Sequence, residues 1–427
     1  MNADGNGLDE GGRTRAAMLA LGERAKAAAP ALAQASTARK DDALRRAADL
    51  LESRRDGLVA ANEADITAAA VNGVPEALVD RLRLSDARVA AMAAGLRQVA
   101  GLADPVGEIV AGWVRPNGLE IRQVRVPLGV VAIIYESRPN VTSDAAGLCL
   151  KSGNVAFLRG SGSAINSNIA IAAVLREAFA SAGLPEDSLL LVEDTRHSAA
   201  VEFMQLSNHI DCLIPRGGRK LIASVKANAT VPTIIDGDGN CHVYVDASAD
   251  LDMAERILVN AKMQRPSVCN AAESLVVHRA VAERFLPRAV AALEGVSLVG
   301  DAMTRRIVAG VGEATEEDWS TEYLDLKMSV RVVDDLDEAI AHVNATSSGH
   351  SEAIVTSDIG AANRFTREVD AAAVLVNAST RFVDGEEFGF GAEIGISIQK
   401  LHARGPMGLT QLTTTKYVVT GDGQIRI

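Results

Sequence analysis

Cysteine is scarce in this chain, and its few copies lie far apart. The 427 residues contain four cysteines, at positions 149, 212, 241 and 269, and no two of them form a C-x-x-C pair. This spacing predicts neither a disulfide framework nor a zinc site, and the zinc-binding H-E-x-x-H motif does not occur either. We therefore expect no bound metal, and thiols that stay reduced as they do in the cytoplasm.

Long apolar runs and clusters of positive charge are also missing. The longest apolar run, around Leu128–Ile134, is far too short to span a bilayer, and the acidic start M-N-A-D-G-N-G-L-D-E is unlike a signal peptide. The formal net charge is −12 and the basic residues do not bunch, which argues against a nucleic-acid-binding surface. These observations predict a soluble cytoplasmic protein with no membrane or nucleic-acid partner.

The residues that are present have the balance of a folded protein. Hydrophobic residues make up 48% and charged residues 23%, which argues against disorder, and the length suggests roughly two to four domains. Residues 13–102 are rich in strong helix formers with apolar positions near a helical repeat. We expect several amphipathic helices there, with breaks at Asn62 and at Gly73–Pro75.

Around Val114 the pattern changes to strands that alternate with helices. Leu119–Val126 alternates apolar and polar residues, and V-V-A-I-I-Y after Gly129 is a continuous apolar run typical of a covered parallel strand. Further strands are expected at 155–158, 189–192 and 211–214, with helices at 143–150, 165–182, 198–206 and from residue 219. This alternation predicts an α/β fold with a doubly wound parallel sheet, whose ligands bind at the carboxyl ends of the strands.

A second α/β unit is expected after a glycine-bearing hinge at Gly237 and Gly239. Strands at 242–246 and 275–277 and helices at 251–263 and 281–293 extend this unit to about residue 376. Near the C-terminus, T-T-T-K-Y-V-V-T is a β-branched run that predicts an edge strand. Together with Leu119–Val126, this strand could project from the body and build a homo-oligomer.

The stretch K-M-Q-R-P-S-V-C-N-A-A-E-S, residues 262–274, contains a candidate nucleophile. Lys262 and Arg265 precede Cys269, and Pro266 suits the first turn of a helix. A helix that began near Ser267 would place Cys269 in its first turn, where the helix dipole and the cations favour a reactive thiolate. The alternative is that Cys269 is a small buried hydrophobic residue, as most free cysteines are.

Two glycine-bearing turns could bind the phosphates of a dinucleotide. They are R-G-S-G-S-A at 159–164 and P-R-G-G-R-K at 215–220, each after an expected strand, but neither is G-x-G-x-x-G. Glycine can also serve such turns for steric reasons alone. Arg159 and Lys151 favour NADP over NAD, because a 2′-phosphate prefers a cation; alternatively, both are solvated surface charges.

Several strings in the chain resemble one enzyme family. They are Y-E-S-R-P-N-V-T from Tyr135, G-N-C-H-V-Y-V-D from Gly239, S-G-H-S-E-A-I from Ser348, N-A-S-T-R-F from Asn377, F-G-F-G-A-E-I-G from Phe388 and Q-K-L-H-A-R-G-P-M-G-L from Gln399. These strings are similar to signature segments of the γ-glutamyl phosphate reductases, members of the aldehyde dehydrogenase superfamily. The resemblance runs in order from about residue 15 to the C-terminus, with Ser351-Glu352 where Thr-Asp is common.

The resemblance implies an aldehyde dehydrogenase-like fold in three parts. These are a Rossmann-like NADP-binding domain at 1–114 and 129–238 with a return segment at 384–398, an α/β catalytic domain at 239–383, and a small β oligomerisation flap at 115–128 and 399–427. The implied reaction converts γ-glutamyl phosphate and NADPH to glutamate 5-semialdehyde, phosphate and NADP⁺, the second step from glutamate to proline. A homo-oligomer, dimer or tetramer, and a glutamate 5-kinase partner are expected with it.

The same resemblance assigns roles to individual residues. Cys269 is the implied nucleophile, and Asn140 with the Cys269 N–H donates to the oxyanion; alternatively, Asn140 caps the next helix. Glu322 is implied to hold the nicotinamide ribose, the alternative being a solvated loop carboxylate. Cofactor contacts at the adenine and phosphate end are implied for Arg159, Ser161, Pro215, Arg216 and Gly217.

The substrate carries negative charge at both ends, and four residues are candidates to pair with it. They are Arg265, His350, Arg381 and Arg404, since arginine suits bidentate oxyanion contacts. His350 could equally be a turn residue behind Gly349, and Arg404 could serve the subunit interface.

Two other functions stay open at this point. The string D-G-D-G-N, residues 236–240, stands where hydrolytic aldehyde dehydrogenases have the E-L-G-G that carries their base, and we do not assign Asp236 as a base. A thioester-forming enzyme that acts on an acyl-CoA or hydrolyses its thioester is the main rival. A non-catalytic interaction protein is the other, and the presence of Cys269, Asn140 and Glu322 argues against it.

Overall fold

The computed structural model describes residues 10–426, and contacts divide the chain into two compact units. The first unit comprises Met1–Ile235, Phe390–Ile394 and Met407–Ile427, and the second comprises Asp236–Gly389 and Gly395–Pro406. The polar start that predicts no signal peptide lies outside the described residues, except for Glu10. Among the described helices, none is long and apolar enough to cross a membrane.

The first unit begins with helices, as predicted from residues 13–102. They are α1 (Glu10–Ala33), α2 (Thr37–Ser53), α3 (Arg55–Val71), α4 (Glu76–Leu82) and α5 (Asp86–Gly101). The expected break at Gly73–Pro75 is confirmed, but the break at Asn62 is wrong, since this residue lies inside α3. Its buried amide donates to the carbonyl of Leu82 at 2.8 Å and accepts from the N–H of Leu84 at 2.7 Å. Asn62 therefore satisfies the chain at the end of α4 instead of ending its own helix.

The doubly wound sheet predicted for this unit is present as four parallel strands in the order β5-β4-β3-β6. The strands are β3 (Val130–Tyr135), β4 (Val155–Arg159), β5 (Leu189–Leu191) and β6 (Cys212–Arg216), and the helices between and after them are α6 (Asn140–Lys151), α7 (Ile165–Ser181), α8 (His197–Met204) and α9 (Arg219–Asn228). All six side chains of β3 are buried, as its continuous apolar run predicts. The chain leaves β3 toward β4 and later returns on the other side at β6. A crevice for a ligand is therefore expected between the carboxyl ends of β3 and β6.

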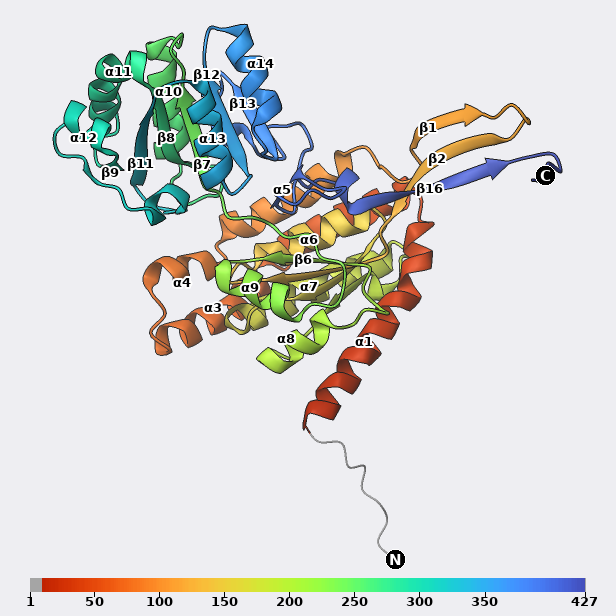
Figure 1. Ribbon diagram of the computed structural model, residues 1–427. Helices are drawn as coiled ribbons and strands as arrows, with labels where there is room; N and C mark the ends of the chain where they lie inside the picture. The colour runs from red at the N-terminus through yellow and green to blue at the C-terminus, as the bar shows by residue number, and fades with distance from the viewer. Residues whose placement is uncertain (1–9, 427) are drawn as a thin grey trace, which may run out of the picture. The chain divides into compact units, whose positions relative to one another are not determined.

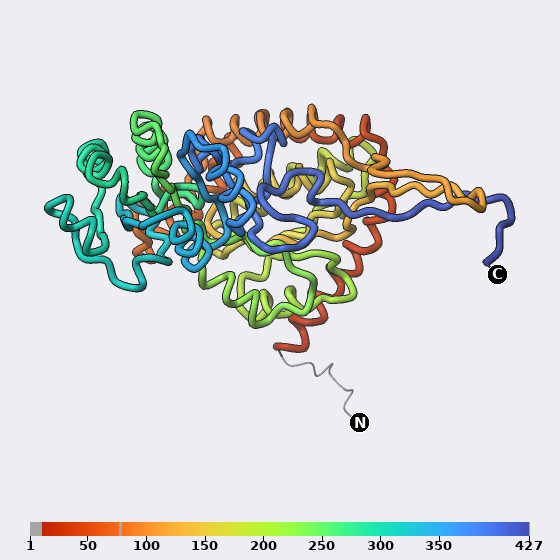
Figure 2. The backbone as a smooth tube through the Cα atoms, turned by 45° about the horizontal axis from the view of Figure 1, so that its top comes forward, coloured from red at the N-terminus to blue at the C-terminus, as the bar shows by residue number. Residues whose placement is uncertain are grey.

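A three-stranded antiparallel sheet extends away from the helices of the first unit, and its strands run side by side in two views (Figures 1 and 2). It comprises β1 (Ile109–Val114), β2 (Glu120–Pro127) and β16 (Thr413–Thr420) in the order β1-β2-β16. The expected C-terminal edge strand is confirmed. The hairpin partner β1 belongs to this sheet, although the predicted boundary grouped residues up to 114 with the cofactor domain.

The second unit is built on seven parallel strands in the order β10-β9-β11-β8-β7-β12-β13. They are β7 (Cys241–Val245), β8 (Ala272–His278), β9 (Ser297–Gly300), β10 (Gly312–Glu313), β11 (Lys327–Val333), β12 (Ser351–Val355) and β13 (Ala373–Val376). The helices are α10 (Leu251–Met263), α11 (Arg279–Ala292), α12 (Ala302–Ile307), α13 (Leu336–Thr346) and α14 (Ile359–Glu368).

Helices cover both faces of this sheet because successive strand side chains point to opposite sides. Val243 and Val245 of β7 enter a core with α10 and α11, whereas Tyr244 between them enters a core with α13 and α14. A short ladder, β14 (Ile396–Ser397) with β15 (Gly405–Pro406), belongs to the same unit. Only residues 390–394 of the predicted return segment 384–398 cluster with the first unit.

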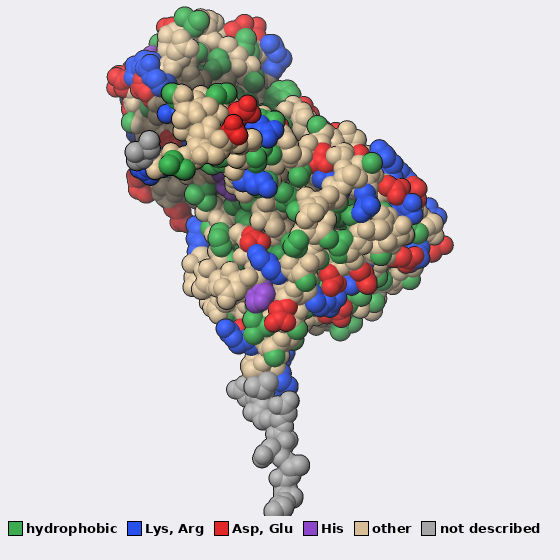
Figure 3. Space-filling model, turned by 90° about the vertical axis from the view of Figure 1, so that its right-hand side faces the viewer, with side chains coloured by type: hydrophobic (Ala, Val, Ile, Leu, Met, Phe, Trp, Pro, Cys, Tyr) green, Lys and Arg blue, Asp and Glu red, His purple; other side chains and the backbone are tan. Residues whose placement is uncertain are grey.

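Charges of both signs are mixed on one face of the molecule. On the face shown in Figure 3, the described acidic and basic side chains are interspersed instead of gathered by sign. This face therefore offers no continuous basic track for a phosphate backbone, in agreement with the even spread of Lys and Arg along the sequence.

Candidate active site

Cys269 lies in a turn between α10 and β8, and its residue is partly exposed. The helix predicted to begin near Ser267 is wrong: residues 266–270 form turns and the strand begins at Ala272. The turn is tightened by a bond from the N–H of Ala271 to the carbonyl of Val268 at 3.0 Å. Pro266 thus follows the end of one helix, and the helix-dipole argument for a reactive thiolate does not apply.

The candidate residues of the second unit gather at the amino ends of its strands. Gly239 precedes β7, Cys269 precedes β8, Glu322 precedes β11 and His350 precedes β12. The prediction that ligands bind at carboxyl ends applies to the first sheet, whereas in this sheet the candidate residues lie at the amino ends of the strands.

The carboxyl ends of β7 and β12 are filled by the protein's own side chains. The carboxylate of Asp246 accepts from the hydroxyls of Ser248 and Thr356, both at 2.8 Å, and from Tyr244 at 3.3 Å. Because these polar groups form hydrogen bonds with one another, they are poorly placed to bind a ligand at the carboxyl ends of β7 and β12.

Gly239 connects the cysteine turn to Glu322. Its N–H donates to Oε1 of Glu322 at 2.7 Å. A Cβ atom built on Gly239 would lie 1.6 Å from the carbonyl oxygen of Cys269, closer than any two such atoms can approach. Only glycine lets the backbone before β7 lie against the backbone of the candidate nucleophile.

Two fully buried groups, Cys241 and His350, lie behind the cysteine turn. The thiol of Cys241 donates to the carbonyl of Cys269 at 3.2 Å, and Nδ1 of His350 lies 3.8 Å from that sulfur and 2.7 Å from the hydroxyl of Ser351. Burial raises the pKa of Cys241 well above 9.0 and lowers the pKa of His350 to about 4. Cys241 is thus a neutral thiol and His350 a neutral imidazole, with no exposed surface for direct contact with a substrate.

Two of the four predicted substrate residues lie beside the cysteine. Nε of Arg381 donates to Oε1 of Gln264 at 2.8 Å. Burial and the nearby guanidinium of Arg265 lower the pKa of Arg381, while Asp384 and Cys269 oppose this. Arg381 therefore lies close enough to Arg265 and to Cys269 for each of them to shift its pKa. Arg404 instead pairs with Asp370 at 2.9 Å.

The predicted cofactor residues of the first unit lie at the carboxyl ends of β4 and β6. The hydroxyls of Ser161 and Ser163 are 2.6 Å apart, and Ser161 also accepts from the N–H of Ser137 at 3.3 Å. Arg159 donates to the carbonyl of Thr195 at 2.8 Å, and its buried Nε has no hydrogen-bond partner among residues 10–426. Hydroxyls and a guanidinium at these strand ends suit a phosphate-bearing dinucleotide.

The turn after β6 closes on a carboxylate. Pro215 and Arg216 end that strand, and the N–H of Gly218 donates to Oε2 of Glu136 at 2.9 Å. A Cβ on Gly217 would lie 2.6 Å from the same oxygen, so a larger residue there would require the Glu136 side chain to move.

The prediction that Lys151 offers a cation to the phosphate of NADP is wrong. This lysine is fully buried, pairs with Asp41 and donates to the carbonyl of Ala100 at 3.0 Å. The prediction of NADP therefore depends on Arg159 alone.

Asn140 is the first residue of α6 and is exposed. Its alternative role as a helix cap is wrong, because Pro139 holds the cap position. Its side-chain amide donates to Oδ2 of Asp144 at 2.9 Å, and burial raises the pKa of Asp144 to about 6. An amide has two N–H groups, so a second donor remains for a ligand.

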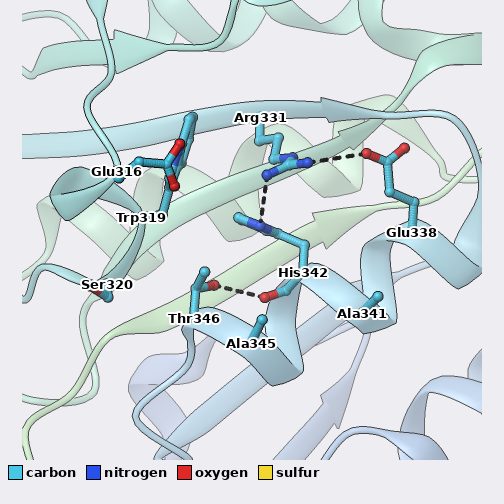
Figure 4. Close-up of a pocket in the computed structure, with 9 residues that line it drawn as sticks. All are labelled: Glu316, Trp319, Ser320, Arg331, Glu338, Ala341, His342, Ala345 and Thr346. Atoms are coloured by element: carbon cyan, nitrogen blue, oxygen red, sulfur yellow. Dashed lines mark hydrogen bonds and ion pairs between the residues drawn. The ribbon is translucent and has the colours of Figure 1, made fainter.

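A pocket of about 440 Å³ lies between η3 (Glu317–Ser320), β11 and α13 (Figure 4). Within it, the guanidinium of Arg331 lies 3.3 Å from Nδ1 of His342 and 3.2 Å from Oε1 of Glu338. The carbonyls of Trp319 and Thr346 in its wall accept from the amide of Asn240, both at 2.9 Å. The pocket does not include Cys269, but its wall supports the segment that leads into β7.

The buried His350 makes stability depend on pH. Its pKa is about 4 in the folded protein and 6.5 when unperturbed, so between these values the unfolded chain binds a proton that the folded chain does not. The contribution of His350 to the free energy of unfolding is thus fully present above pH 6.5, and it is lost as the pH falls toward 4. His350→Gln should reduce the slope of unfolding free energy against pH by up to about 1.4 kcal/mol per unit. Urea unfolding at several pH values measures this, and equal slopes for both proteins would contradict it.

Three residues of the site were not identified from sequence. The sequence pattern indicates only a hinge at Gly239, and it assigns no role to Glu273 or to Asp144. The spacing of Asn140 and Asp144, four residues apart in an expected helix, was a usable signal because such residues share a helix face. The close contact between Gly239 and Cys269 left no sequence signal.

Comparison with known proteins identifies the family to which the chain belongs. A model of the aldehyde dehydrogenase family matches residues 12–316 and 328–418. The γ-glutamyl phosphate reductase of Thermobifida fusca is 56% identical over 408 residues, covering 95% of this chain and 98% of that protein. That of Clostridium beijerinckii is 54% identical over 411 residues, covering 96% and 99%. The crystal structure of γ-glutamyl phosphate reductase from Thermotoga maritima superposes with a TM-score of 0.95 at 49% identity, covering 96% of this chain and all of that one.

These matches confirm the predicted family and fold class. A nicotinamide cofactor follows from membership of the aldehyde dehydrogenase family. The chain belongs to that family and, within it, to the γ-glutamyl phosphate reductases, whose reaction is a step of proline biosynthesis.

Proposed function

We propose that this chain reduces γ-glutamyl phosphate to glutamate 5-semialdehyde through a thioester on Cys269, with NADPH as the reductant. The observation that carries the proposal is the partly exposed Cys269, whose charge and that of Arg265 both act on Arg381. The backbone of Cys269 also lies so close to Gly239 that only glycine fits at position 239. The other three cysteines are buried, with at most 4% of their surface exposed. Burial raises the pKa of each of their thiols, so they are poor nucleophiles.

The thiolate of Cys269 attacks the acyl carbon and the bond to phosphate breaks, which leaves a thioester and free phosphate. NADPH, when bound, would supply the hydride that reduces this thioester. The hemithioacetal then collapses to the aldehyde and regenerates the thiol. Each tetrahedral species carries an oxyanion, and we assign the second amide N–H of Asn140 and the N–H of Cys269 as its donors.

Arg265 and Arg381 are assigned to the negative charges of the substrate. Two guanidiniums close together repel each other, and an anion between them relieves that repulsion. His350 and Arg404 remain weaker candidates, since His350 is fully buried and Arg404 is engaged by Asp370. We expect His350 and Arg404 to stabilise the local structure without contacting the substrate.

We assign the cofactor contacts by the role of each residue. Arg159, Ser161, Pro215, Arg216 and Gly217 take the adenine and phosphate end, and Glu322 takes the nicotinamide ribose. The flap of β1, β2 and β16 is assigned to homo-oligomer contacts, in a dimer or tetramer. A glutamate 5-kinase is the expected source of the labile acyl phosphate.

Hydrolysis of the thioester is the less favoured function. Oδ1 of Asp236, the acid nearest to the place of a hydrolytic base, accepts the N–H of Ile396 at 3.0 Å. This bond ties the carboxylate to the β14 ladder, and it supports a structural role for Asp236.

Arg159→Ala tests the proposed preference for NADPH. We expect the KM for NADPH to rise about tenfold and the KM for NADH to change little, because only NADPH carries the 2′-phosphate. Steady-state kinetics with both cofactors measure this. A rise of equal size for both would show that Arg159 serves the fold of its turn and not the phosphate.

The proposed reaction is tested in reverse with purified protein, glutamate semialdehyde, phosphate and NADP⁺. We expect NADPH to form only when phosphate is present, and formation to stop when iodoacetamide alkylates one cysteine that peptide mapping identifies as Cys269. NADPH formation without phosphate would favour the hydrolysing enzyme. Dependence on coenzyme A would favour the acyl-CoA enzyme.

A further inference from the structure

We infer that the buried pair Lys262–Glu273 is a positioning device that fixes the cysteine turn and the Glu322 turn relative to each other. This inference rests on the proposed function, since it assigns the pair to the cofactor-holding role proposed for Glu322. Neither residue touches substrate or cofactor in this assignment. Both act through the backbone segments that they connect.

The pair brackets the cysteine turn. Nζ of Lys262, in the last turn of α10, lies 2.5 Å from Oε2 of Glu273, the second residue of β8, and neither side chain is exposed. The residues between them include Cys269. The ion pair therefore joins the two ends of the turn that presents the sulfur, so the turn cannot open without breaking it.

The second oxygen of the same carboxylate reaches the segment before β11. Oε1 of Glu273 accepts the N–H of Leu324 at 3.1 Å. Leu324 has a φ of 56°, a left-handed conformation that is unfavourable for leucine and needs support from its surroundings. Glu322 is two residues away, and its Oε1 accepts the N–H of Gly239 at 2.7 Å. Glu273 thus supports the strained turn from which Glu322 reaches the backbone beside Cys269.

The buried pair is costly, which argues that it does more than stabilise the fold. Burial raises the pKa of Glu273 to about 7 and lowers that of Lys262, so the interior resists both charges. Replacing a buried ion pair by apolar side chains of similar volume is often neutral or stabilising. A pair with only a structural role could therefore be replaced without effect on the site.

Two double variants separate the roles. K262M/E273M removes the charges and the acceptor for Leu324, whereas K262M/E273Q removes the charges but keeps a carbonyl oxygen for that N–H. We expect the first to raise the Kd for NADPH, measured by fluorescence titration without substrate, about five- to tenfold, the effect of one lost hydrogen bond. The second should stay within about twofold of the unmodified protein.

Hydrogen exchange adds a readout that stability alone does not move. The amide of Leu324 should exchange faster in K262M/E273M than in K262M/E273Q, even if the two variants have the same melting temperature. If K262M/E273M does not fold, K262M/E273L makes the same comparison. Equal Kd values and equal exchange in the two variants, or an unchanged Kd in K262M/E273M, would overturn the inference.

Glu322→Gln, measured alongside, separates this failure from failure of the proposed function. Weak NADPH binding by E322Q with normal binding by K262M/E273M would remove the positioning role and leave the role of Glu322 intact. Normal binding by E322Q would remove both. Turnover that depends on phosphate and on Cys269 tests the proposed reaction independently of either result.

Discussion

Cys269→Ser should lower kcat/KM for the phosphate-dependent reaction by about 10³-fold or more. A serine hydroxyl fills nearly the same space but does not ionise near neutral pH, so the thioester cannot form. NADPH binding should be unchanged, because the change removes a nucleophile and leaves the backbone in place. Stopped-flow or steady-state kinetics, together with a fluorescence titration of NADPH, measure both quantities.

Cys241→Ser is the matched control for this prediction. Its hydroxyl can still donate to the carbonyl of Cys269, as the thiol does at 3.2 Å, so the turn keeps its support. We expect activity within a few-fold of the unmodified protein. Full activity in Cys269→Ser would rule out Cys269 as the nucleophile, and a large loss in Cys241→Ser beside it would move the nucleophile to position 241.

Gly239→Ala should lower kcat/KM by about 10²-fold or more. Its added methyl group would meet the carbonyl carbon and oxygen of Cys269 at 2.4 Å and 1.6 Å, so one of the two backbone segments must move. A displacement of about 1 Å at a reacting group is enough for a loss of this size. The same shift breaks the bond to Glu322, so NADPH should also bind more weakly.

Gly57→Ala is the control for Gly239→Ala. Gly57 lies within α3, and a Cβ there meets nothing within 4 Å. Alanine in a helix is favoured over glycine by about 0.5–1 kcal/mol, so this variant should be fully active and slightly more stable. Thermal unfolding checks that Gly239→Ala is folded when its activity is measured. Normal activity in a folded Gly239→Ala protein would show that the close approach to Cys269 has no role in catalysis.

Local sequence patterns were sufficient for the elements and their order. The apolar run at Val130–Tyr135 forms one strand, and the helix expected at Leu251–Met263 forms with the same bounds. Such segments are predictable because periodicity reflects which faces of an element are buried. Glycine and proline marked the turn at Gly73–Pro75 for equally local reasons. The family strings, each a few residues long, then identified the chain, as the matches to its relatives confirm.

Only the tertiary structure decided which residues meet. Lys151 and Lys262 look alike in sequence as cations near candidate sites, yet each is buried against a carboxylate, 110 residues away in one case and 11 in the other. The end of the second sheet that presents Cys269, and the contact between Gly239 and the Cys269 carbonyl, likewise depend on how separate segments are brought together. The physical reason is that propensity and periodicity act within a few residues, whereas the partner of a buried charge or the closeness of two backbones is set by the packing of the whole unit.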